Sequence, residues 1–341
     1  MKKLLAIAVA AALTAPAAMA ETTLYGKLHA TAGQVKTTTA GVTTKDNVVE
    51  SHNSRIGVKG STELDNGLSA TYGVEYGLDL DGDNASTSTA TATSRTLNAR
   101  NTFVGVKGGF GEVRVGRHDT PAKLATAGLD AFADGYADMS NIIAADGQRI
   151  DNVVAYIGKF GPVGVAAAHS TDVDLSGQAA PSGERDLNGG NDASSMLVNY
   201  SNGPIYAGLG HTAVQKTLKS TNLGVGYKAE AGHFANLVVE EAKVPTGAAA
   251  NAGEKDQNVY VAGGFKTGAA TLKVGYGESK HKGDAVAANN GKEKQTTVGI
   301  DYSLGKKTST YLLLNEDKNT AQAVGGTGKT SQAVVGLVTE F

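Results

Sequence analysis

The sequence predicts an all-β protein, a 16-stranded antiparallel transmembrane β-barrel with a long constriction loop folded into its lumen. Three observations predict this fold. Segments of about ten residues with alternating apolar and polar side chains recur along the whole chain, tight turns and long polar loops alternate between them, and no apolar stretch after the first twenty residues is long enough to span a membrane as a helix.

The first twenty residues are expected to be removed after export. Two lysines precede an apolar run over residues 4–13, and the stretch 18–20 reads Ala-Met-Ala. This arrangement is typical of a secretory signal peptide with its cleavage site. We therefore expect a signal peptide over residues 1–20 and a single barrel domain over residues 21–341. Loss of the two lysines changes the formal net charge from -2 to -4.

Composition excludes several classes of protein. A net charge of -2 without a basic tract argues against a nucleic-acid-binding protein. The absence of cysteine excludes a disulfide framework and a thiolate metal site. The 7 histidines show no spacing typical of metal ligands, so we expect neither a metal site nor a cofactor.

The alternation is clear in residues 222–228. Leu223, Val225 and Tyr227 share one face there, and glycine or polar residues occupy the other. The same period-two pattern defines sixteen segments, with boundaries good to roughly 2–4 residues. They are residues 23–33, 50–59, 68–78, 98–107, 112–117, 150–159, 163–172, 194–201, 204–213, 220–229, 233–243, 256–265, 269–279, 293–303, 307–316 and 331–341.

The connections between these segments alternate in length. The short ones are 108–111, 160–162, 202–203, 231–232, 266–268 and 304–306. The long ones include 34–49, 79–97, 174–193 and 280–292. Tight turns at one end and long loops at the other are typical of a bacterial outer-membrane barrel. No domain linker interrupts the series.

The longest connection, residues 118–149, differs in composition. It contains aspartates at positions 119, 130, 134, 138 and 146 together with apolar side chains such as Leu124, Leu129 and Phe132. Loops of this length usually have a function or are disordered, and the apolar side chains favour packing against another surface. Inside a wide barrel that surface is the inner wall, so we expect this loop to narrow the lumen. An exposed surface loop is the alternative.

A soluble β-sandwich would also show alternation, because its two sheets bury apolar faces in a shared core. Sixteen consecutive segments, with glycine on the polar face and connections of unequal length, favour a single closed sheet. The polar face then lines water, and the apolar face meets lipid or a neighbouring subunit. Six aromatic residues on the apolar face fit an interfacial girdle, although ordinary cross-strand packing would explain any one of them: Tyr72, Tyr76, Tyr227, Phe265, Tyr276 and Tyr302.

Three stretches and the C-terminal strand carry a resemblance to a known family. The stretches are TLYGKL at 23–28, SRIGVKGSTELDNGLSATYGVEY at 54–76 and ARNTFVGVKGGFGEVRVGR at 99–117. With them, the chain after the signal peptide resembles the trimeric general porins of Gram-negative bacteria, in particular the type found in Neisseria and other β-proteobacteria. The resemblance implies a homotrimer in the outer membrane, in contact with outer-membrane lipid and lipopolysaccharide.

The resemblance also gives a role to the last residue. Val335, Leu337, Thr339 and Phe341 alternate along the final segment, and in this family a terminal phenylalanine is the usual signal for the barrel assembly machinery. Family members commonly have a basic pair before that phenylalanine. This chain has Thr339 and Glu340 instead.

A general porin does no covalent chemistry, so its function depends on the pore diameter and on the charges that line it. Alternation places several lysines and one arginine toward the lumen: Lys27, Arg55, Lys59, Lys107, Lys228 and Lys273. The loop offers the acidic side of the constriction, with Asp119, Asp130, Asp134 and Asp138. Opposite charges across the narrowest section would create a transverse field.

By resemblance, three arginines form the basic side of that constriction: Arg55, Arg100 and Arg149. Arg117, at the end of its segment, is a fourth candidate. Arg100 has the same parity as Val104 and Val106, which we expect to face outward. Its assignment to the pore therefore requires a β-bulge between them; without a bulge Arg100 lies at the outer rim.

The sequence thus predicts an outer-membrane general diffusion porin for ions and small hydrophilic solutes. We expect a weak to moderate preference for anions, because charges at the constriction act within a Debye length of ~8–10 Å. Inward projection of the loop aspartates would reverse that sign. The alternatives are a solute-specific channel, which would need an aromatic or paired-charge track, a barrel adhesin, and a rim-site enzyme. For an enzyme, the nearest pair is His118 and Asp119, which as strand neighbours point to opposite faces.

Overall fold

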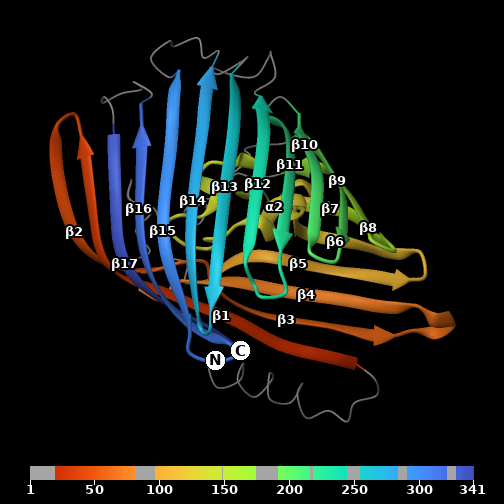
Figure 1. Ribbon diagram of the computed structural model, residues 1–341. Helices are drawn as coiled ribbons and strands as arrows, with labels where there is room; N and C mark the ends of the chain where they lie inside the picture. Colours follow the sequence, from red (N-terminus) through yellow and green to blue (C-terminus); the bar gives the residue numbers. More distant parts are fainter. Residues whose placement is uncertain are drawn as a thin grey trace.

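The computed structural model describes residues 20–81, 97–147, 149–173, 191–215, 218–243, 254–282, 290–320 and 328–341. In this part of the chain, 17 β-strands form one sheet, and every neighbouring pair is antiparallel (Figure 1). The expected signal peptide lies outside the described residues except for Ala20. None of the described helices has the length and hydropathy needed to cross a membrane.

The strands follow one another around the sheet in chain order. They are β1 (Ala20–Thr39), β2 (Val42–Ser51), β3 (Ser54–Glu63), β4 (Ser69–Leu78), β5 (Leu97–Gly108), β6 (Gly111–Asp119), β7 (Arg149–Phe160), β8 (Val163–Val173), β9 (Asn191–Asn202), β10 (Ile205–Val214), β11 (Leu218–Lys228), β12 (Phe234–Lys243), β13 (Lys255–Thr267), β14 (Ala270–Lys282), β15 (Gly291–Ser303), β16 (Thr308–Asn319) and β17 (Gly328–Glu340). Pairing of β1 with β17 closes the sheet into a barrel.

The prediction of a 16-stranded barrel is confirmed, because β2 and β3 together make one barrel strand. The first part of β1 pairs with β3, with Lys27 opposite Arg55, and its second part pairs with β2, with Ala30 opposite Ser51. The break between β2 and β3 falls at His52 and Asn53, where Asn53 has a φ of 47°.

The prediction of a long loop over residues 34–49 is wrong. These residues continue β1 and β2 as a hairpin, whose turn is formed by Ala40 and Gly41 with φ values of 51° and 82°. Two positive φ angles are characteristic of the tight turns that join hairpin strands. The threonines and valines of this stretch favour extended backbone, so the strands run on to the turn instead of ending near the apolar band.

The two faces of the barrel differ as the alternation predicts. On β11, Leu223 and Val225 are 46% and 41% exposed on the outside, whereas Asn222 is fully buried on the inside. Outward apolar side chains of this kind occur on strands around the whole barrel. The barrel therefore presents an apolar belt outside, whereas its inner face carries polar side chains together with apolar ones that are buried in small clusters.

Tight turns lie at the end of the barrel where the C-terminus is marked in Figure 1. Gly161, Gly203 and Gly268 supply turn residues there with φ values of 59°, 55° and 57°. At this end Phe341 also closes the seam of the barrel. Its backbone N–H donates to the Gly26 carbonyl (3.1 Å), and its carbonyl accepts from the Gly26 N–H (3.3 Å).

The connection between β6 and β7 lies against the inner wall (Figure 1). It contains α2 (Pro121–Thr126) and three short 3-10 helices, η2 (Ala127–Leu129), η3 (Met139–Asn141) and η4 (Ala144–Gly147). Inward amides hold it: Asn222 donates to the Ala122 carbonyl (2.9 Å), and Asn236 donates to the Leu129 carbonyl (2.8 Å). We call residues 120–147 the inner loop.

Candidate functional site

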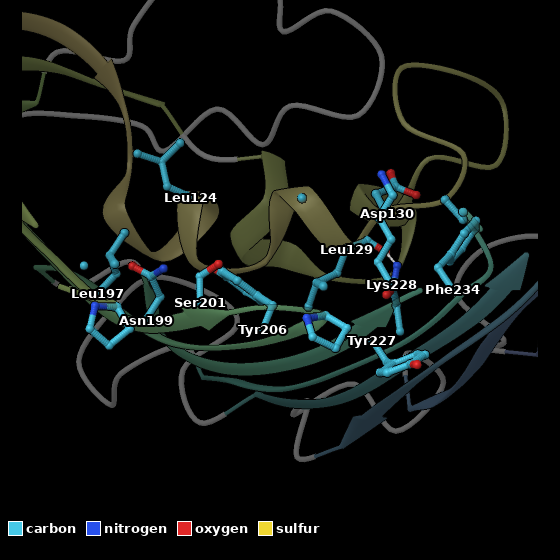
Figure 2. Close-up of a pocket in the computed structure, with 18 of the residues that line it drawn as sticks. Leu124, Leu129, Asp130, Leu197, Asn199, Ser201, Tyr206, Tyr227, Lys228 and Phe234 are labelled. Carbon is cyan, nitrogen blue, oxygen red and sulfur yellow. Dashed lines mark hydrogen bonds between the residues drawn. The ribbon is translucent and has the colours of Figure 1, made fainter. Parts of the chain in front are cut away.

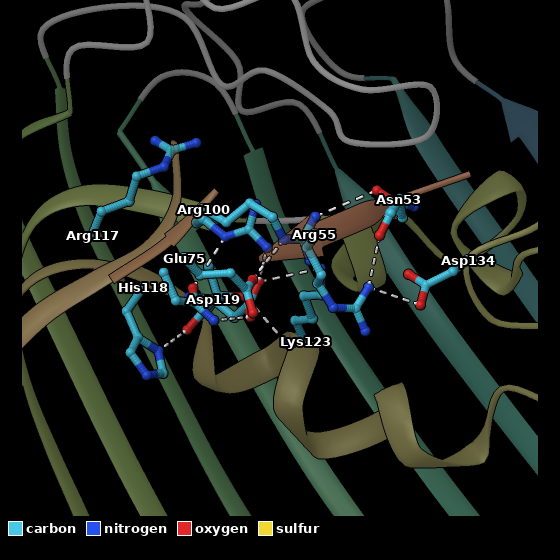
Figure 3. A network of polar contacts seen from close by, with 12 residues as sticks. Asn53, Arg55, Glu75, Arg100, Arg117, His118, Asp119, Lys123 and Asp134 are labelled. Carbon is cyan, nitrogen blue, oxygen red and sulfur yellow. Dashed lines mark hydrogen bonds and ion pairs between the residues drawn. The ribbon is translucent and has the colours of Figure 1, made fainter. Parts of the chain in front are cut away.

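The candidate site is the ring of charged side chains between the inner loop and the wall formed by β1 and β3 to β7 (Figure 3). At its centre, Lys27 and Arg55 stand directly opposite each other on β1 and β3. Asp134 of the inner loop lies between them, with its Oδ2 at 2.7 Å from the Lys27 Nζ and 3.0 Å from an Arg55 guanidinium nitrogen. One loop carboxylate thus binds two wall cations.

These two cations keep Asp134 ionised. Burial alone would raise the pKa of its carboxyl, but Arg55 and Lys27 outweigh burial and hold the pKa at about 2. Asp134 also has a positive φ of 63°, a conformation that aspartate tolerates better than most residues do. Its backbone N–H donates to the Asp138 carboxylate (2.6 Å), which fixes the loop tip.

A second carboxylate, Asp119 at the end of β6, also binds two cations. Its Oδ1 lies 2.8 Å from Arg149 and 3.2 Å from Lys123, and its Oδ2 accepts a bond from the Asn101 amide (2.6 Å). The side chain of Arg149 is only 2% exposed. Arg149 and Asp119 are directly opposite in the β6–β7 ladder, so this group joins the wall to the first turn of α2.

Arg100 faces the lumen because β5 bulges. The β4–β5 register shifts between Val74 and Tyr76, so that Arg100 and Asn101 together stand opposite Glu75. This is the bulge that an inward Arg100 requires. The Arg100 Nε donates to the Glu75 carboxylate at 2.6 Å, and both side chains are about 10% exposed.

Arg117 does not join this group. The ladder pairs it with Thr102, one position before the inward Phe103, so Arg117 shares the outer face of Val104 and Val115. There its guanidinium lies 2.5 Å from Asp151, whereas in Figure 3 its side chain stands apart from the other labelled arginines. The expectation that Arg117 lines the pore is therefore wrong. β6 keeps its alternation here, because the register shift between Gly116 and His118 places the extra residue on β7.

The other two loop aspartates hold the loop and do not contact the wall cations. Asp130 accepts from the backbone N–H groups of Phe132 (2.8 Å) and Met139 (2.9 Å) and from the Tyr260 hydroxyl (3.1 Å). Asp138 accepts from Asp134 and from the Ser140 N–H (2.8 Å). The expected acidic side thus separates into two aspartates that face cations, 119 and 134, and two that fold the loop, 130 and 138.

The remaining expected lysines line two cavities below the inner loop, toward the tight turns. Lys59 and Lys107 line a cavity of about 600 Å³ between β1 and β3 to β6. Lys228 and Lys273 line a larger one, of about 950 Å³. Figure 2 shows the larger cavity between the inner loop, with Leu129 and Asp130, and side chains of the barrel strands. Its Lys273 donates to the Ala131 carbonyl (2.6 Å) and pairs with Asp301 (2.7 Å).

Four charged residues of the site were not among the sequence-predicted ones: Glu75, Glu112, Arg114 and Lys123. Arg114 pairs with Glu112 at 2.7 Å and lies over the ring of Phe103, 4.0 Å from its centre. Strand parity alone places Glu75, Glu112 and Arg114 inward, so the alternation in the sequence is enough to predict that they face the lumen. No such signal exists for Lys123, which depends on the path of α2.

The charges of the site do not cancel. The ring holds six basic side chains (Lys27, Arg55, Arg100, Arg114, Lys123 and Arg149) and four acidic ones (Glu75, Glu112, Asp119 and Asp134). The excess is two positive charges. Lys59, Lys107 and Glu21, which line the cavity on the same wall, add one more. The arrangement can attract and orient ions that pass through the lumen.

Comparisons with known proteins bear on the family and the fold of the chain. A family model described as Gram-negative porin matches residues 6–322. The major outer membrane protein P.IB of Neisseria sicca is 28% identical over 367 residues, which cover 99% of this chain and 98% of that protein. Outer membrane porin protein 32 of Delftia acidovorans is 27% identical over 345 residues, covering 94% and 91%.

Solved structures show the same fold. The anion-selective porin from Comamonas acidovorans superposes with a TM-score of 0.71 at 24% identity, covering 94% of this chain and all of that one. The trimer form of OmpT from Vibrio cholerae gives 0.66 at 16% identity over 95% of this chain. Because the family model spans most of a chain that closes into a barrel with a charged, polar interior, the protein belongs to the Gram-negative porin family of outer-membrane proteins.

Proposed function

We propose that the protein is a general diffusion porin, a water-filled channel through which ions and small hydrophilic solutes cross the outer membrane passively. The observation that carries this proposal is the charged ring between inner loop and wall, set in a barrel whose inward apolar side chains are covered by the inner loop. Barrels of this strand number leave an aqueous channel. The inner loop then acts as the constriction, over about residues 118–149.

We further propose a preference for anions. The ring has an excess of positive charge, and both loop aspartates that face it are bound to two cations each. The other two loop aspartates accept backbone N–H bonds within the loop. Local charge outweighs distant loop charge because salt screens beyond ~8–10 Å. The porin from Comamonas acidovorans that shares this fold is anion-selective, which agrees with this proposal.

Planar bilayer recording tests both parts. Purified protein under a potassium chloride gradient should give stepwise conductance and a reversal potential of the sign that chloride permeation produces. Arg55→Gln should move that potential toward zero, because it removes one of the excess positive charges from the ring. Lys306→Gln, in an exposed turn residue at the barrel end, is the matched control and should leave the potential unchanged.

Each other outcome is informative. Conductance with a potassium-favouring potential would keep the channel and overturn the anion preference. A folded protein without conductance would overturn the channel itself. An equal shift in Arg55→Gln and Lys306→Gln would show that total charge, not the ring, determines selectivity.

We infer that the barrel has no catalytic role. His118, the histidine nearest to a catalytic arrangement, bonds through Nδ1 to the Asp119 backbone carbonyl (2.7 Å) and through Nε2 to Arg114 (2.9 Å). Both ring nitrogens are therefore occupied by groups that do not activate a nucleophile. A porin needs no such chemistry, since its work is done by pore shape and charge.

We also propose a homotrimer, with assembly of each barrel aided by recognition of Phe341 by the barrel assembly machinery. A trimer form among the fold neighbours supports the oligomeric state. The contacts between subunits must be non-covalent, because the chain has no cysteine. The full chain has a mass of 34.6 kDa. Unheated gel electrophoresis after chemical cross-linking should show a band at three times the mass of the chain without its signal peptide.

A further inference from the structure

A histidine and two carboxylates meet on the inner face of the barrel, at the end opposite the tight turns. They are Glu254, Asp256 and His281, and their possible metal-ligating atoms all lie within 4.8 Å of one another. Glu254 directly precedes β13, Asp256 belongs to β13 and His281 belongs to β14. Within the described ranges of the chain, no other three histidine or acidic side chains are grouped in this way.

The sheet register brings these side chains together. Asp256 and His281 stand directly opposite each other in the β13–β14 ladder, and they share the inward parity of the buried residues Tyr260 and Ser279. The Nδ1 of His281 lies 2.7 Å from the Asp256 Oδ1, and the two side chains are 13% and 10% exposed. Because the histidine and the aspartate come from neighbouring strands, no short spacing in the sequence marks them.

A third carboxylate lies at the other nitrogen of the His281 ring. The Glu293 Oε2, on β15, is 3.7 Å from the His281 Nε2, and the Glu293 Oε1 accepts a bond from the Asn319 amide (2.8 Å). Histidines that bind a metal through one nitrogen commonly have a carboxylate beside the other, which fixes the orientation of the ring. The ring of His281 is therefore placed as a metal ligand would be.

The group carries more negative charge than its histidine can balance. Three carboxylates against one protonated imidazole leave two negative charges. The lysines beside them on the same strands face outward and pair with outward glutamates instead. Lys255 contacts Glu241, and Lys280 and Lys292 contact Glu278. A divalent cation would supply the charge that the wall lacks here.

A buried amide oxygen next to Asp256 points in the same direction. Asn258, the next inward residue of β13, is 5% exposed. Its Nδ2 donates to Glu240 on β12 (2.8 Å), which turns its Oδ1 away from β12, and this Oδ1 has no hydrogen-bond donor among the described residues. A buried acceptor without a donor is costly, and a cation bound beside Asp256 would lower that cost.

We propose that Glu254, Asp256 and His281 bind a divalent transition-metal ion such as zinc. An imidazole nitrogen together with carboxylate oxygens suits zinc, whereas calcium and magnesium take oxygen ligands. Ligands of a tetrahedral ion with bonds of about 2.0–2.1 Å lie about 3.3 Å apart. The Asp256 Oδ1 and the His281 Nδ1, now 2.7 Å apart, would need to separate only slightly.

The bound ion would join β13 to β14 at the mouth of the lumen, in place of the hydrogen bond that joins them now. This role goes beyond passive diffusion and does not depend on it. The ion should therefore stabilise the barrel, because it binds the folded chain and not the unfolded one.

Isothermal titration calorimetry with zinc chloride tests the proposal on purified, untagged, metal-free protein in uncharged detergent. One zinc should bind per barrel. Binding should weaken at least about tenfold in His281→Gln, Asp256→Asn and Glu254→Gln, and Glu254→Asp, which keeps the carboxylate, should retain most of it. The matched control is His211→Gln, since His211 contacts only the Thr221 hydroxyl through its Nδ1 (2.8 Å); this variant should bind zinc as the wild type does.

Thermal unfolding provides a second readout. Zinc should raise the melting temperature of the wild type and of His211→Gln, but not that of His281→Gln, whose β-sheet circular dichroism should match the wild type. An excess of magnesium should not displace the zinc.

Four results would overturn the proposal: no zinc binding by the folded wild type, undiminished binding in His281→Gln, an equal loss in His281→Gln and His211→Gln, or displacement by magnesium. The last would mean that the acidic side chains attract any divalent cation without a defined site. The titration does not require a conducting pore, so its failure and the failure of the channel proposal are separate results.

Discussion

The charged residues inside the barrel are arranged so that single carboxylates bind pairs of cations. Asp134 and Asp119 each contact two basic side chains, and Glu75 contacts Arg100. A carboxylate between two cations orients both without neutralising both. The lumen therefore keeps positive charge at a defined place, which is what ion selectivity requires.

Replacement of Asp134 by asparagine should raise the preference for anions. The change leaves Lys27 and Arg55 without their shared counter-ion and increases the positive excess of the ring by one. The reversal potential in a salt gradient should move further in the chloride direction. Asp65→Asn, in an exposed turn between β3 and β4, changes the total charge equally and should have little effect on the reversal potential. A decrease in anion preference in Asp134→Asn would contradict the proposed role of this carboxylate.

The pH dependence of this contact follows from the pKa of Asp134. Because that pKa is about 2 in the folded protein and 3.8 ordinarily, the contact stabilises the loop fully above the ordinary value and loses its effect as the pH falls toward 2. Selectivity attributable to Asp134 should therefore stay constant from pH 7 to about pH 4. Reversal potentials recorded across this range check it, and a change near pH 6 that Asp134→Asn abolishes would refute it.

The outer pair of Arg117 and Asp151 gives a different residue-scale prediction. Their side chains are 15% and 24% exposed on the apolar side of the barrel. Arg117→Leu should destabilise the barrel by on the order of 3 kcal/mol, because it leaves Asp151 as an unpaired charge. Arg117→Leu/Asp151→Leu should recover most of that loss. Urea unfolding in lipid vesicles measures both, and equal stability of the single and double variants would contradict the pairing.

Residue types and strand parity predicted most of this site but not all of it. Lys27 and Arg55 follow from unbroken alternation. Arg100 does not, because a single bulge reverses the facing of every residue beyond it. Arg117 is a pore candidate from its place at the end of its segment, whereas the alternation from Val113 to Gly116 places it outside.

At the scale of elements, the inner loop is held by the barrel wall as well as by its own aspartates. Its short helices have few residues each, and their polar groups are satisfied by inward side chains of β9 to β13. Glycines on the wall make room for it. A Cβ at Gly224 would approach Leu129 Cδ1 to 2.5 Å, and one at Gly210 would approach the Ala122 backbone to 2.6 Å.

Glu240 anchors the C-terminal part of the loop. Its carboxylate accepts from the backbone N–H groups of Ala144 (2.6 Å) and Ala145 (2.8 Å), and from the side chains of Ser220 and Asn258. Glu240→Ala should loosen the loop, since each buried donor left without an acceptor costs about 1–3 kcal/mol. We expect noisier single-channel current and a larger solute size limit in liposome swelling.

The neighbouring residue supplies a matched control for that experiment. Glu241 has the same chemistry but faces outward, where it contacts Lys243 and Lys255. Glu241→Ala should leave current noise and size limit as in the wild type. Similar behaviour of the two variants would mean that the inner loop does not depend on the Glu240 contact.

The strands are predictable from the alternation of apolar and polar residues and from the turns between segments, with one exception. The sequence predicts a loop where the β1–β2 hairpin lies, because residues 36–46 are polar on both faces. Alternation of hydropathy marks a strand only where one face meets lipid. Outside the membrane a strand can continue without that signal. The alternation therefore predicts that strands end at the edge of the apolar belt.

At the scale of the whole molecule, closure of the barrel depends on the seam between its first and last strands. β1 and β17 pair over a long register, from Lys27 with Glu340 to Thr39 with Gly328. The sequence alone could predict closure from the even strand count, but not which residues complete the seam. In the structure, the Phe341 ring lies over Gly26, where an added Cβ would come within 2.3 Å of the ring.

Substitution at this seam separates physical closure from recognition during assembly. Phe341→Ala keeps the two backbone bonds to Gly26 but removes the ring, so in vesicles it should refold to the same barrel with a lower melting temperature. Gly26→Ala keeps the phenylalanine but displaces its ring, and in vesicles it should be destabilised to a similar degree. In cells the two should differ, because Phe341→Ala also removes the proposed assembly signal. Its yield in the outer membrane should fall well below that of Gly26→Ala, and equal yields would mean that the ring matters only for closure.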